Sequence, residues 1–208
     1  MAKQIEGVYE RVLECAKEEF LKSGYKDASM RTIAVAARTT TGSIYTRFGD
    51  KEGLFSALVE PVVQEMLQTF CRTQEIFHGL DRQTKINTMP EYSSKSMEQL
   101  LDYMYARFDE FRLLLDSSYG TKYHHFIDEM VRIEVESTYR YMEVIGCENV
   151  KRGIVTEEFL HIITTAYFEG VFEVVRHNMQ YEEAKKYINM LRDYHMAGFG
   201  TIFSPPST

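Results

Sequence analysis

Residues 29–51, SMRTIAVAARTTTGSIYTRFGDK, are the stretch that decides the fold. Its apolar residues follow a helical period in two short runs, one around Ile33 and one around Ile44. Ser29 is a typical N-cap for the first run. Threonines at positions 39–41 interrupt the pattern, because threonine is β-branched and caps helices well. Two short helices joined by a turn of about three or four residues have the spacing of a helix-turn-helix motif.

The second of these helices presents an unusual outer face for a core element. Ile44 and Phe48 face inward, and the opposite side carries small hydroxyls, a tyrosine and an arginine: Thr41, Ser43, Tyr45, Thr46 and Arg47. Such side chains contact bases and phosphates in a DNA groove. Gly42 allows close approach to the DNA backbone, and Lys51 can hold a phosphate. The face predicts DNA binding, although many short helices carry these residues without any such role.

The composition is that of a globular protein with one large domain or two small ones. The chain has 208 residues, of which 44% are hydrophobic and 26% charged. No apolar run reaches the roughly 18 residues that span a bilayer, and the N-terminus lacks the apolar segment of a secretory signal. We therefore expect a cytoplasmic protein with no membrane partner. Three cysteines lie far apart, which predicts free thiols rather than a disulfide or a zinc site.

The charge of the chain is unevenly distributed. Residues 1–51 contain nine Lys and Arg and seven Asp and Glu, a balance of +2, whereas residues 52–208 contain fifteen and twenty-four, a balance of −9. The local field at a contact face matters more for DNA binding than the charge of the whole protein. The net charge of −7 therefore does not exclude a DNA-binding N-terminal segment.

Helical periodicity continues along the rest of the chain, so we expect an all-α fold. A long helix begins after Asp50 as its N-cap, and Pro61 within it predicts a kink. Residues 71–95 are expected to be the least regular part, with a short helix within 71–88 followed by a loop. Further helices are expected at about residues 97–115, 123–145, 156–178 and 181–203.

Three consecutive sequence patterns match a known family. An N-terminal helix ending in FLKSGY is followed by ASMRTIAVAA and then by TGSIYTRFGDKEGLF. Over about residues 5–58 the chain resembles the DNA-binding domain of the TetR family of bacterial transcriptional regulators. The resemblance implies a three-helix helix-turn-helix domain over residues 1–50. It also implies a helical bundle for ligand binding and dimerisation over residues 51–204. The proline-containing tail at 205–208 is expected to be disordered from its own sequence.

The family's partners follow from the same resemblance. It implies a homodimer that binds a palindromic operator in double-stranded DNA and usually acts as a repressor. A small-molecule effector in the C-terminal domain releases the DNA. No cofactor is implied.

The recognition helix implied by the resemblance is Thr40–Phe48. The residues expected at the DNA are Ser29, Arg31, Arg38, Thr40, Thr41, Gly42, Ser43, Tyr45, Thr46, Arg47 and Lys51. Arg38 departs from the family pattern, which usually has glycine in the turn. Either Arg38 adopts a left-handed backbone conformation or the turn is reshaped, and its guanidinium could add a phosphate contact. Thr41 stands where the family often has Lys or Gln, so the base preference cannot be carried over.

The C-terminal part is rich in residues suited to an apolar ligand. Residues 52–208 carry eleven Tyr, eleven Phe and nine Met, most of which must be ordinary core. The resemblance places a set of residues around an effector cavity, namely Tyr103, Met104, Phe108, Phe111, Phe126, Met130, Glu134 and Tyr167. Aromatic and methionine walls suit an apolar or aromatic effector, and a filled core is the alternative. Glu134 could pair with a cationic ligand, although solvent exposure or a structural ion pair is the simpler expectation.

The last two expected helices are long and closely connected. Glycines on their apolar sides permit a close crossing. In the family these helices build a four-helix dimer interface, which implies contacts by Gly170, Val171, Val174, Leu191, His195, Gly198 and Ile202. The alternative is that both helices pack within one subunit.

No catalytic or metal site is expected. None of the six histidines lies in H-E-x-x-H, and no serine stands in G-x-S-x-G. Adjacent His124 and His125 would point about 100° apart on a helix and would not chelate one ion together. An α-helical enzyme is disfavoured, because no acid–base pair or nucleophile set appears. The sequence thus predicts a ligand-responsive DNA-binding repressor, and the alternative is an all-α ligand-binding or interaction module without DNA-binding activity.

Overall fold

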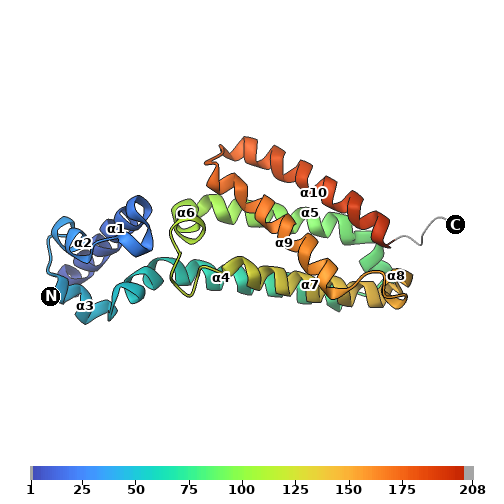
Figure 1. The fold of residues 1–208 in the computed structure, drawn as a ribbon, viewed down its shortest axis with the longest axis horizontal. Coiled ribbons are helices and arrows are strands. Elements are labelled where there is room, and N and C mark those ends of the chain that lie inside the picture. The colour runs from blue at the N-terminus through green and yellow to red at the C-terminus, as the bar shows by residue number, and fades with distance from the viewer. Residues whose placement is uncertain (1, 204–208) are drawn as a thin grey trace. The chain divides into compact units, whose positions relative to one another are not determined.

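The computed structural model describes residues 2–203, which form ten α-helices and no strand (Figure 1). The predicted all-α fold is confirmed, and the predicted tail at 205–208 lies outside the described residues. The helices, in chain order, are α1 (Ala2–Asp27), α2 (Met30–Ala36), α3 (Thr41–Phe48), α4 (Lys51–Gly79), α5 (Arg82–Ala106), α6 (Phe108–Asp116), α7 (Phe126–Ile145), α8 (Glu148–Lys151), α9 (Glu157–Arg176) and α10 (Tyr181–Phe203).

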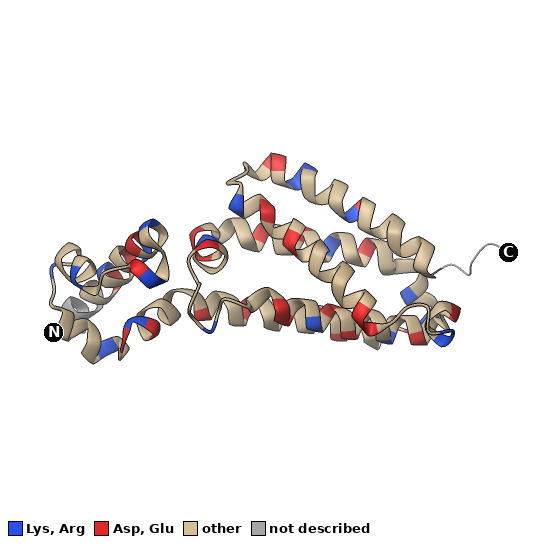
Figure 2. Cartoon of the chain, in the orientation of Figure 1, with Lys and Arg blue, Asp and Glu red and all other residues tan. Residues whose placement is uncertain are grey.

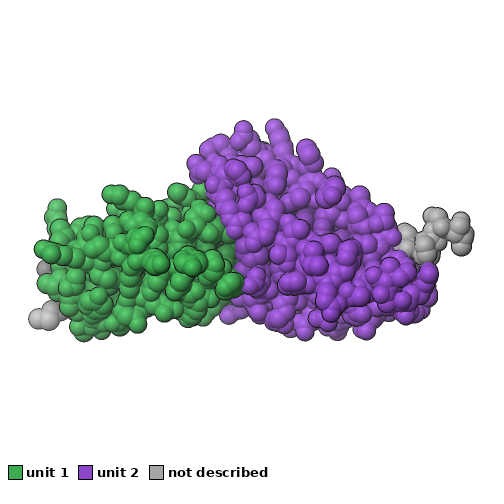
Figure 3. Space-filling model, in the orientation of Figure 1, with its two compact units in different colours: residues 1–65, 107–126 green, residues 66–106, 127–208 purple. Residues whose placement is uncertain are grey.

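The chain divides into two compact units, each assembled from two separate stretches (Figure 3). Unit 1 comprises residues 1–65 and 107–126, and unit 2 comprises residues 66–106 and 127–208. The sequence suggested domains over residues 1–50 and 51–204, and that functional division stays a prediction. By compactness, the first part of α4 and all of α6 fall in unit 1.

Unit 1 is organised around α1, which packs against α2 and α6. Ala16 and Phe20 of α1 are completely buried. The ring of Phe20 packs edge-on against Phe55 of α4, with 5.1 Å between the ring centroids. Near the end of α1, the amide of Tyr25 donates to the carbonyl of Ser117, which follows α6, at 2.9 Å. This packing explains why α6 belongs to the N-terminal unit although it lies more than fifty residues later in the sequence.

Three predicted helix boundaries in unit 1 are confirmed. Gly24 interrupts α1 with φ 71° and ψ 165°, and only a short final segment follows it. The hydroxyl of Ser29 accepts a hydrogen bond from the amide of Thr32 at 3.3 Å and caps α2. Asp50 caps α4 in the same way, because its carboxylate accepts from the amide of Gly53 at 2.7 Å.

The turn between α2 and α3 contains Arg38 in the left-handed region, with φ 53°. The sequence left two possibilities, a left-handed Arg38 or a reshaped turn, and the structure has the left-handed Arg38. The turn is held by hydrogen bonds: the amide of Thr39 donates to Ala34 at 2.9 Å, and the guanidinium of Arg11 donates to the carbonyl of Ala37 at 2.9 Å. Non-glycine residues rarely adopt this conformation, so the turn stores strain at Arg38.

The region expected to be irregular is helical apart from a short break, so that prediction was wrong. The helix α4 continues through Pro61 to Gly79, and α5 begins after Asp81. The carboxylate of Asp81 accepts from the amide of Thr84 at 3.0 Å and starts α5. Pro90 lies inside α5, where it lacks the amide hydrogen of a normal helical residue. Packing of the apolar face of α5 in unit 2 outweighs the weak local helix propensity.

The helix expected over residues 97–115 is divided into α5 and α6 at Arg107. The backbone there has φ −129° and ψ 36°, outside the helical region. The division lets α6 bury Phe111, Leu113 and Leu114 in unit 1. The helices α7, α9 and α10 lie within about three residues of their expected bounds, and the expected connection before α9 contains the short α8.

Unit 2 is a helical bundle in which α10 packs on both α9 and α5. The second part of α4 lies beside α7 (Figure 1), and their side chains exchange hydrogen bonds. Phe168, Val171 and Phe172 of α9 form much of the buried core. Within residues 2–203, no helix is long and apolar enough to cross a membrane.

Replacing Arg38 with glycine is expected to stabilise the protein. Glycine adopts the left-handed conformation without the roughly 1–2 kcal/mol steric cost, and its greater freedom in the unfolded chain cancels roughly 0.5–1 kcal/mol of that gain. We expect the free energy of unfolding, measured by urea denaturation, to rise by up to about 1 kcal/mol. The control Glu18→Gly, at an exposed position within α1, should lower it by about 1 kcal/mol. A decrease in both variants would contradict the strain at Arg38.

Candidate DNA-binding face and ligand cavity

The residues predicted to contact DNA all lie on or next to α2 and α3, within unit 1. Ile44 is buried and fixes α3 on the core, while Phe48 is half-buried and stacks on the ring of Tyr9 at 5.4 Å. The exposed members of the predicted set are Arg31, Arg38, Thr40, Gly42, Ser43, Tyr45, Thr46 and Arg47; Ser29, Thr41 and Lys51 are half-buried. The inward and outward faces predicted for α3 are therefore found, while DNA contact by these residues stays a prediction.

Local contacts hold the side chains of α3 in place. The hydroxyl of Thr40 accepts from the amide of Ser43 at 3.1 Å, so Thr40 is the N-cap and α3 starts one residue later than expected. The hydroxyl of Thr46 donates to the carbonyl of Gly42 at 2.8 Å. The guanidinium of Arg47 lies 4.3 Å from the centre of the Tyr9 ring. The helix carries one basic and no acidic residue (Figure 2).

Lys51 has a structural partner that the sequence did not reveal. Its ammonium donates to the carbonyl of Lys26 at 3.0 Å and lies 5.2 Å from the centre of the Tyr25 ring. Burial lowers the pKa of Lys51, although Asp27 and Glu19 act in the opposite direction. Lys51 thus joins the start of α4 to the end of α1, and a phosphate at this position would share the ammonium with the Lys26 carbonyl.

Unit 2 contains a cavity of about 130 Å³ bounded by α4, α5, α7, α9 and α10. Its wall is largely aromatic, with rings from Phe70, Phe77, Tyr92, Tyr141, Tyr167 and Phe168. A protein cavity of roughly 150 Å³ admits one benzene ring. The cavity therefore matches a ligand with a single aromatic ring without rearrangement of its wall.

Of the residues predicted around an effector, Glu134 and Tyr167 line this cavity. The other six do not: Tyr103, Met104 and Met130 lie elsewhere in unit 2, and Phe108, Phe111 and Phe126 lie in unit 1.

The sequence analysis missed most of the cavity wall. Gln74 and Tyr92 lie in the segment that was expected to be irregular. No sequence pattern around Arg192 indicated that it lines a cavity. A usable signal was present in α5, because Met89, Tyr92, Ser96 and Leu100 recur at intervals of three and four residues.

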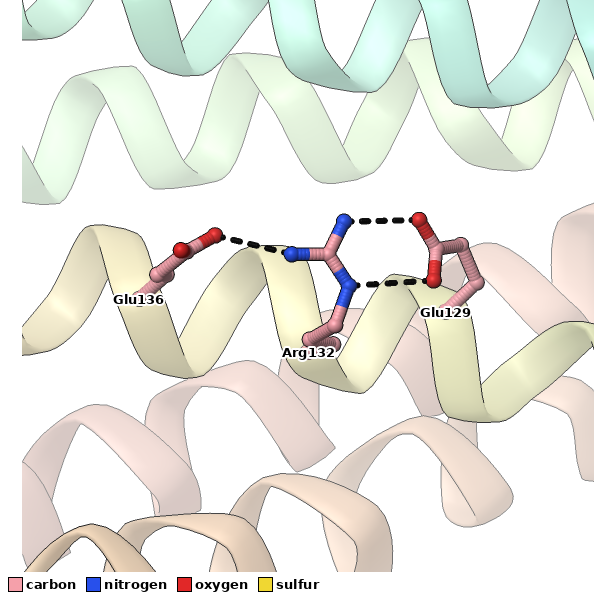
Figure 4. A network of polar contacts seen from close by, with 3 residues as sticks. All are labelled: Glu129, Arg132 and Glu136. Carbon is pink, nitrogen blue, oxygen red and sulfur yellow. Dashed lines mark hydrogen bonds and ion pairs between the residues drawn. The ribbon is translucent and has the colours of Figure 1, made fainter.

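Glu134 lies on the inner face of α7. The outer face of the same helix carries Arg132, which is bound by Glu129 at 2.7 and 3.0 Å and by Glu136 at 3.0 Å (Figure 4). Residues 132 and 134 are about 200° apart around a helix, so the carboxylate of Glu134 points away from this ion-pair network. Glu134 was expected to be solvent-exposed or ion-paired; in the structure it is half-buried, and no basic side chain among the described residues forms an ion pair with it. Desolvation by burial raises the pKa of Glu134 to about 7.

A chain of hydrogen bonds fixes the group that faces Glu134. The amide nitrogen of Gln74 donates to the Glu134 carboxylate at 2.6 Å, and the hydroxyl of Ser137 donates to the amide oxygen of Gln74 at 2.5 Å. The Ser137 hydroxyl must then accept from Nε2 of His78, 2.8 Å away. Burial lowers the pKa of His78, and the charges of Arg140 and Lys85 lower it further. A neutral His78 thus holds Gln74 with its donor side toward Glu134.

The opposite wall of the cavity comes from α9 and α10. His195 of α10 stacks on Tyr167 of α9 with 4.0 Å between ring centroids, and burial lowers the pKa of His195 to about 4. Burial and the charge of Glu134 raise the pKa of Tyr167. Arg192 is half-buried, and its guanidinium donates to Asp193 at 2.7 Å. At neutral pH His195 and Tyr167 are uncharged, so Glu134 and Arg192 are the charged groups of the described cavity wall.

Several residues predicted at a dimer interface have partners within the subunit. Val171 and Val174 are completely buried, so they are not available for contact with a second copy. A Cβ at Gly170 would lie 3.1 Å from Leu191, so this glycine permits the close approach of α10 to α9. His195 lines the cavity. Gly198 is exposed and Ile202 half-buried, and a role for them between subunits stays a prediction.

Exposed apolar side chains on the same two helices were not predicted. Phe159 and Ile162 of α9 are 40% and 65% exposed, and Met190 and Tyr194 of α10 are 73% and 79% exposed. Each pair is spaced by three or four residues, so each lies on one face of its helix. The sequence could have predicted these exposed apolar side chains only if the buried faces of α9 and α10 had first been assigned correctly.

The described residues contain no group of three side chains suited to a metal ion. The rings of His124 and His125 lie against each other with 4.6 Å between centroids, outside any helix.

Comparison with known proteins relates the N-terminal part to a family. Residues 12–58 match the bacterial regulatory proteins of the tetR family. The chain is 39% identical over 57 residues to the uncharacterized HTH-type transcriptional regulator YhgD of Bacillus subtilis, which covers 27% of this chain and 30% of that protein. It is 37% identical over 60 residues to the HTH-type transcriptional repressor AcnR of Corynebacterium efficiens, covering 29% and 32%. The matched part thus spans about a third of each relative's length.

Solved structures share the fold over almost the whole chain. NalD, the secondary repressor of the MexAB-OprM multidrug efflux pump in Pseudomonas aeruginosa, aligns with a TM-score of 0.63 at 17% identity, over 94% of this chain and 97% of NalD. SmeT, in a complex with triclosan, aligns with a TM-score of 0.57 at 19% identity, over 96% of both chains. The helix-turn-helix of this chain is therefore similar in sequence to that of the bacterial regulatory proteins of the tetR family, and its helical fold as a whole is similar to those of NalD and SmeT.

Proposed function

We propose that the chain is a ligand-responsive transcriptional regulator that binds double-stranded DNA through α3 and a small molecule through the cavity of unit 2. The observation that carries this proposal is the outer face of α3. Ser43, Tyr45 and Arg47 are exposed there, on a helix that Ile44 anchors from the inner side. A buried anchor beneath exposed polar side chains is the arrangement by which a recognition helix enters the major groove.

The exposed residues divide into two roles at DNA. Tyr45 and Arg38 would contact phosphates and set the orientation of the protein, because tyrosine and arginine side chains commonly donate to phosphate oxygens. Ser43 and Arg47 would reach base edges, and arginine pairs best with guanine. Gly42 lacks a side chain at the start of α3, so a DNA backbone can approach the helix closely.

A homodimer fits the surface of α9 and α10. One recognition helix reads one half-site, and a palindromic operator requires a two-fold related partner. Exposed Ile162 and Tyr194 offer apolar area for such a contact, and exposed Ala166 and Ala197 lie on the same faces. Small side chains allow helices to approach closely, which favours a four-helix interface made from two copies.

Repression, with release by the ligand, is the mode of regulation that the relatives support. AcnR and NalD are both described as repressors, and SmeT was solved with triclosan, an aromatic small molecule. The helix α4 contributes residues to both units, so it is the element through which ligand binding could bias the DNA-binding unit. A ligand acts in this way only if it binds one conformation more tightly than the other.

The alternative function is an all-α ligand-binding or interaction module without DNA binding. Its support was the net acidity and the arginine in the turn. The turn, however, accommodates Arg38 with the hydrogen bonds of its backbone intact. The DNA-binding proposal is therefore the stronger one.

Truncating Tyr45 tests the DNA-binding face. Tyr45→Ala should weaken binding to DNA from upstream of the protein's own gene by at least about tenfold at 0.1 M salt, because a phosphate contact is lost in each subunit. The control Tyr119→Ala removes a tyrosine of unit 1 that is more exposed than Tyr45 and lies outside the helix-turn-helix, and it should leave affinity unchanged. Fluorescence anisotropy measures both. Equal affinities for the two variants would exclude this face.

Arg38→Gly separates the phosphate contact from folding. The slope of log K against log salt concentration should fall by about 0.9 per subunit, because one counterion-releasing contact disappears. This variant is expected to be more stable than the native protein, so weaker binding cannot be attributed to unfolding. An unchanged slope would remove Arg38 from the contact set.

The dimer is tested at the exposed position on α9. Ile162→Glu should convert a dimer into monomers in sedimentation, because two buried carboxylates would face each other across the two-fold axis. The control Ile76→Glu places the same charge at a similarly exposed isoleucine on α4 and should leave the dimer intact. A native protein that sediments as a monomer would refute the proposed assembly.

A further inference from the structure

We propose that the cavity of unit 2 selects an organic cation, a compound in which one aromatic ring carries a protonated amine, and that Glu134 binds the ammonium group. The inference builds on the proposed function, since it assigns a chemical class to the ligand of the same cavity. It is carried by the geometry around the Glu134 carboxylate.

The carboxylate has neutral donors but no cationic partner. Gln74 donates to one oxygen at 2.6 Å, and the hydroxyl of Thr138 makes the other side-chain hydrogen bond. An ionised carboxylate has about four acceptor positions, so capacity remains for a ligand. Among the described residues, no basic side chain forms an ion pair with Glu134. Glu134 is half-buried. A carboxylate largely withdrawn from water is normally paired, so the position suits a cation supplied from outside the chain.

The basic residue in the same wall is already neutralised within the chain. The guanidinium of Arg192 donates twice to Asp193, at 2.7 and 3.1 Å, and also to Ser94 and Asn189. An anionic ligand at Arg192 would have to compete with these contacts. His195, on the same helix, is neutral above a pKa of about 4. The uncompensated charge in the cavity is therefore negative.

The aromatic wall favours the same ligand. Phe70, Tyr92, Tyr141 and Tyr167 contribute rings to the cavity, and the faces of such rings attract a cation. The charges of Glu134 and Arg192 both act on the pKa of Tyr167, Glu134 raising it and Arg192 lowering it. A ligand ring can stack in this wall while its ammonium reaches Glu134. The volume of about 130 Å³ limits the unrearranged cavity to one ring with a short side chain.

The affinity for such a ligand depends on pH in a defined direction. The pKa of Glu134 is about 7, so below pH 7 the carboxyl holds a proton that the cation must displace. For a cation that stays protonated throughout, affinity at pH 8 should exceed affinity at pH 6 by about tenfold.

The other titratable groups around the cavity do not account for this pH dependence of ligand affinity. His195 is neutral over the range, the pKa of Tyr167 is raised further from it, and Arg192 stays charged. His78, which bonds to the Gln74–Ser137 chain from outside the cavity wall, has a pKa lowered by burial and by the charges of Arg140 and Lys85.

Three small probes that share one ring test the charge preference. Isothermal titration calorimetry of the full chain at pH 8 would compare benzylamine, benzyl alcohol and phenylacetate. Benzylamine is expected to bind at least about tenfold more tightly than benzyl alcohol, and phenylacetate more weakly than both. The expected tenfold loss for benzylamine at pH 6 is measured in the same way.

Variants of α7 separate the role of Glu134 from general charge effects. Glu134→Gln should bring the affinities for benzylamine and benzyl alcohol to within about twofold and abolish the pH dependence. Glu136→Gln removes the same charge from the outer face of the helix and should behave like the native protein. Glu134→Gln should also raise the midpoint of thermal unfolding at pH 8, because a buried charge is removed, and this measurement confirms that the variant is folded.

The outcomes distinguish this proposal from the proposed function. Tighter binding of phenylacetate or of benzyl alcohol than of benzylamine overturns the cation proposal, as does retention of the benzylamine preference in Glu134→Gln. Failure of all three probes to bind at millimolar concentration overturns it as well. The proposed function fails separately, if the Tyr45 variant and its control bind DNA equally well, whatever the probes do.

Discussion

The edge-on contact between Phe20 of α1 and Phe55 of α4 is the interaction on which unit 1 depends. The helices α2 and α3 bury only four residues between them and cannot form a core alone. They are held by α1 through polar contacts as well, including the bond from the Ser29 amide to Glu19 and the bond from Arg11 to Ala37. Loss of a buried phenylalanine costs about 3–5 kcal/mol, so the orientation of α3 rests on side chains remote from it in sequence.

Glu134, in the wall of the proposed ligand cavity, lowers the stability of unit 2. Raising the pKa of Glu134 from 4.5 to about 7 corresponds to about 3 kcal/mol of stability lost at alkaline pH. The rest of the unit is ordinary apolar core, with Phe168, Val171 and Phe172 fully buried. A leucine or methionine at position 134 would fill the same space without this loss. A residue such as Glu134, which lowers the stability of the fold where an apolar residue would not, is typical of a functional position.

Local chemistry made the helix-turn-helix predictable. Ser29, Thr40 and Asp50 act as caps because their short oxygen-bearing side chains reach amides three residues ahead, and Gly24 takes a conformation that other residues avoid. The cavity was predictable only at Glu134 and Tyr167. Its remaining wall depends on α5, a helix maintained by tertiary packing despite Pro90, and on the rotation of α10, which turns His195 inward. The partner of Lys51 is equally a product of tertiary structure.

The discontinuity of unit 1 has a consequence for biosynthesis. The unit needs residues 107–126 in addition to residues 1–65, so a growing chain cannot complete it until residue 126 has been added. Until α6 emerges, the faces of α1 and α4 that pack around it stay uncovered. The helix-turn-helix of a nascent chain would therefore lack its full support during translation. Unit 1 therefore reaches its native structure late, after α4 and α5, which contribute to the cavity wall of unit 2, have already been synthesised.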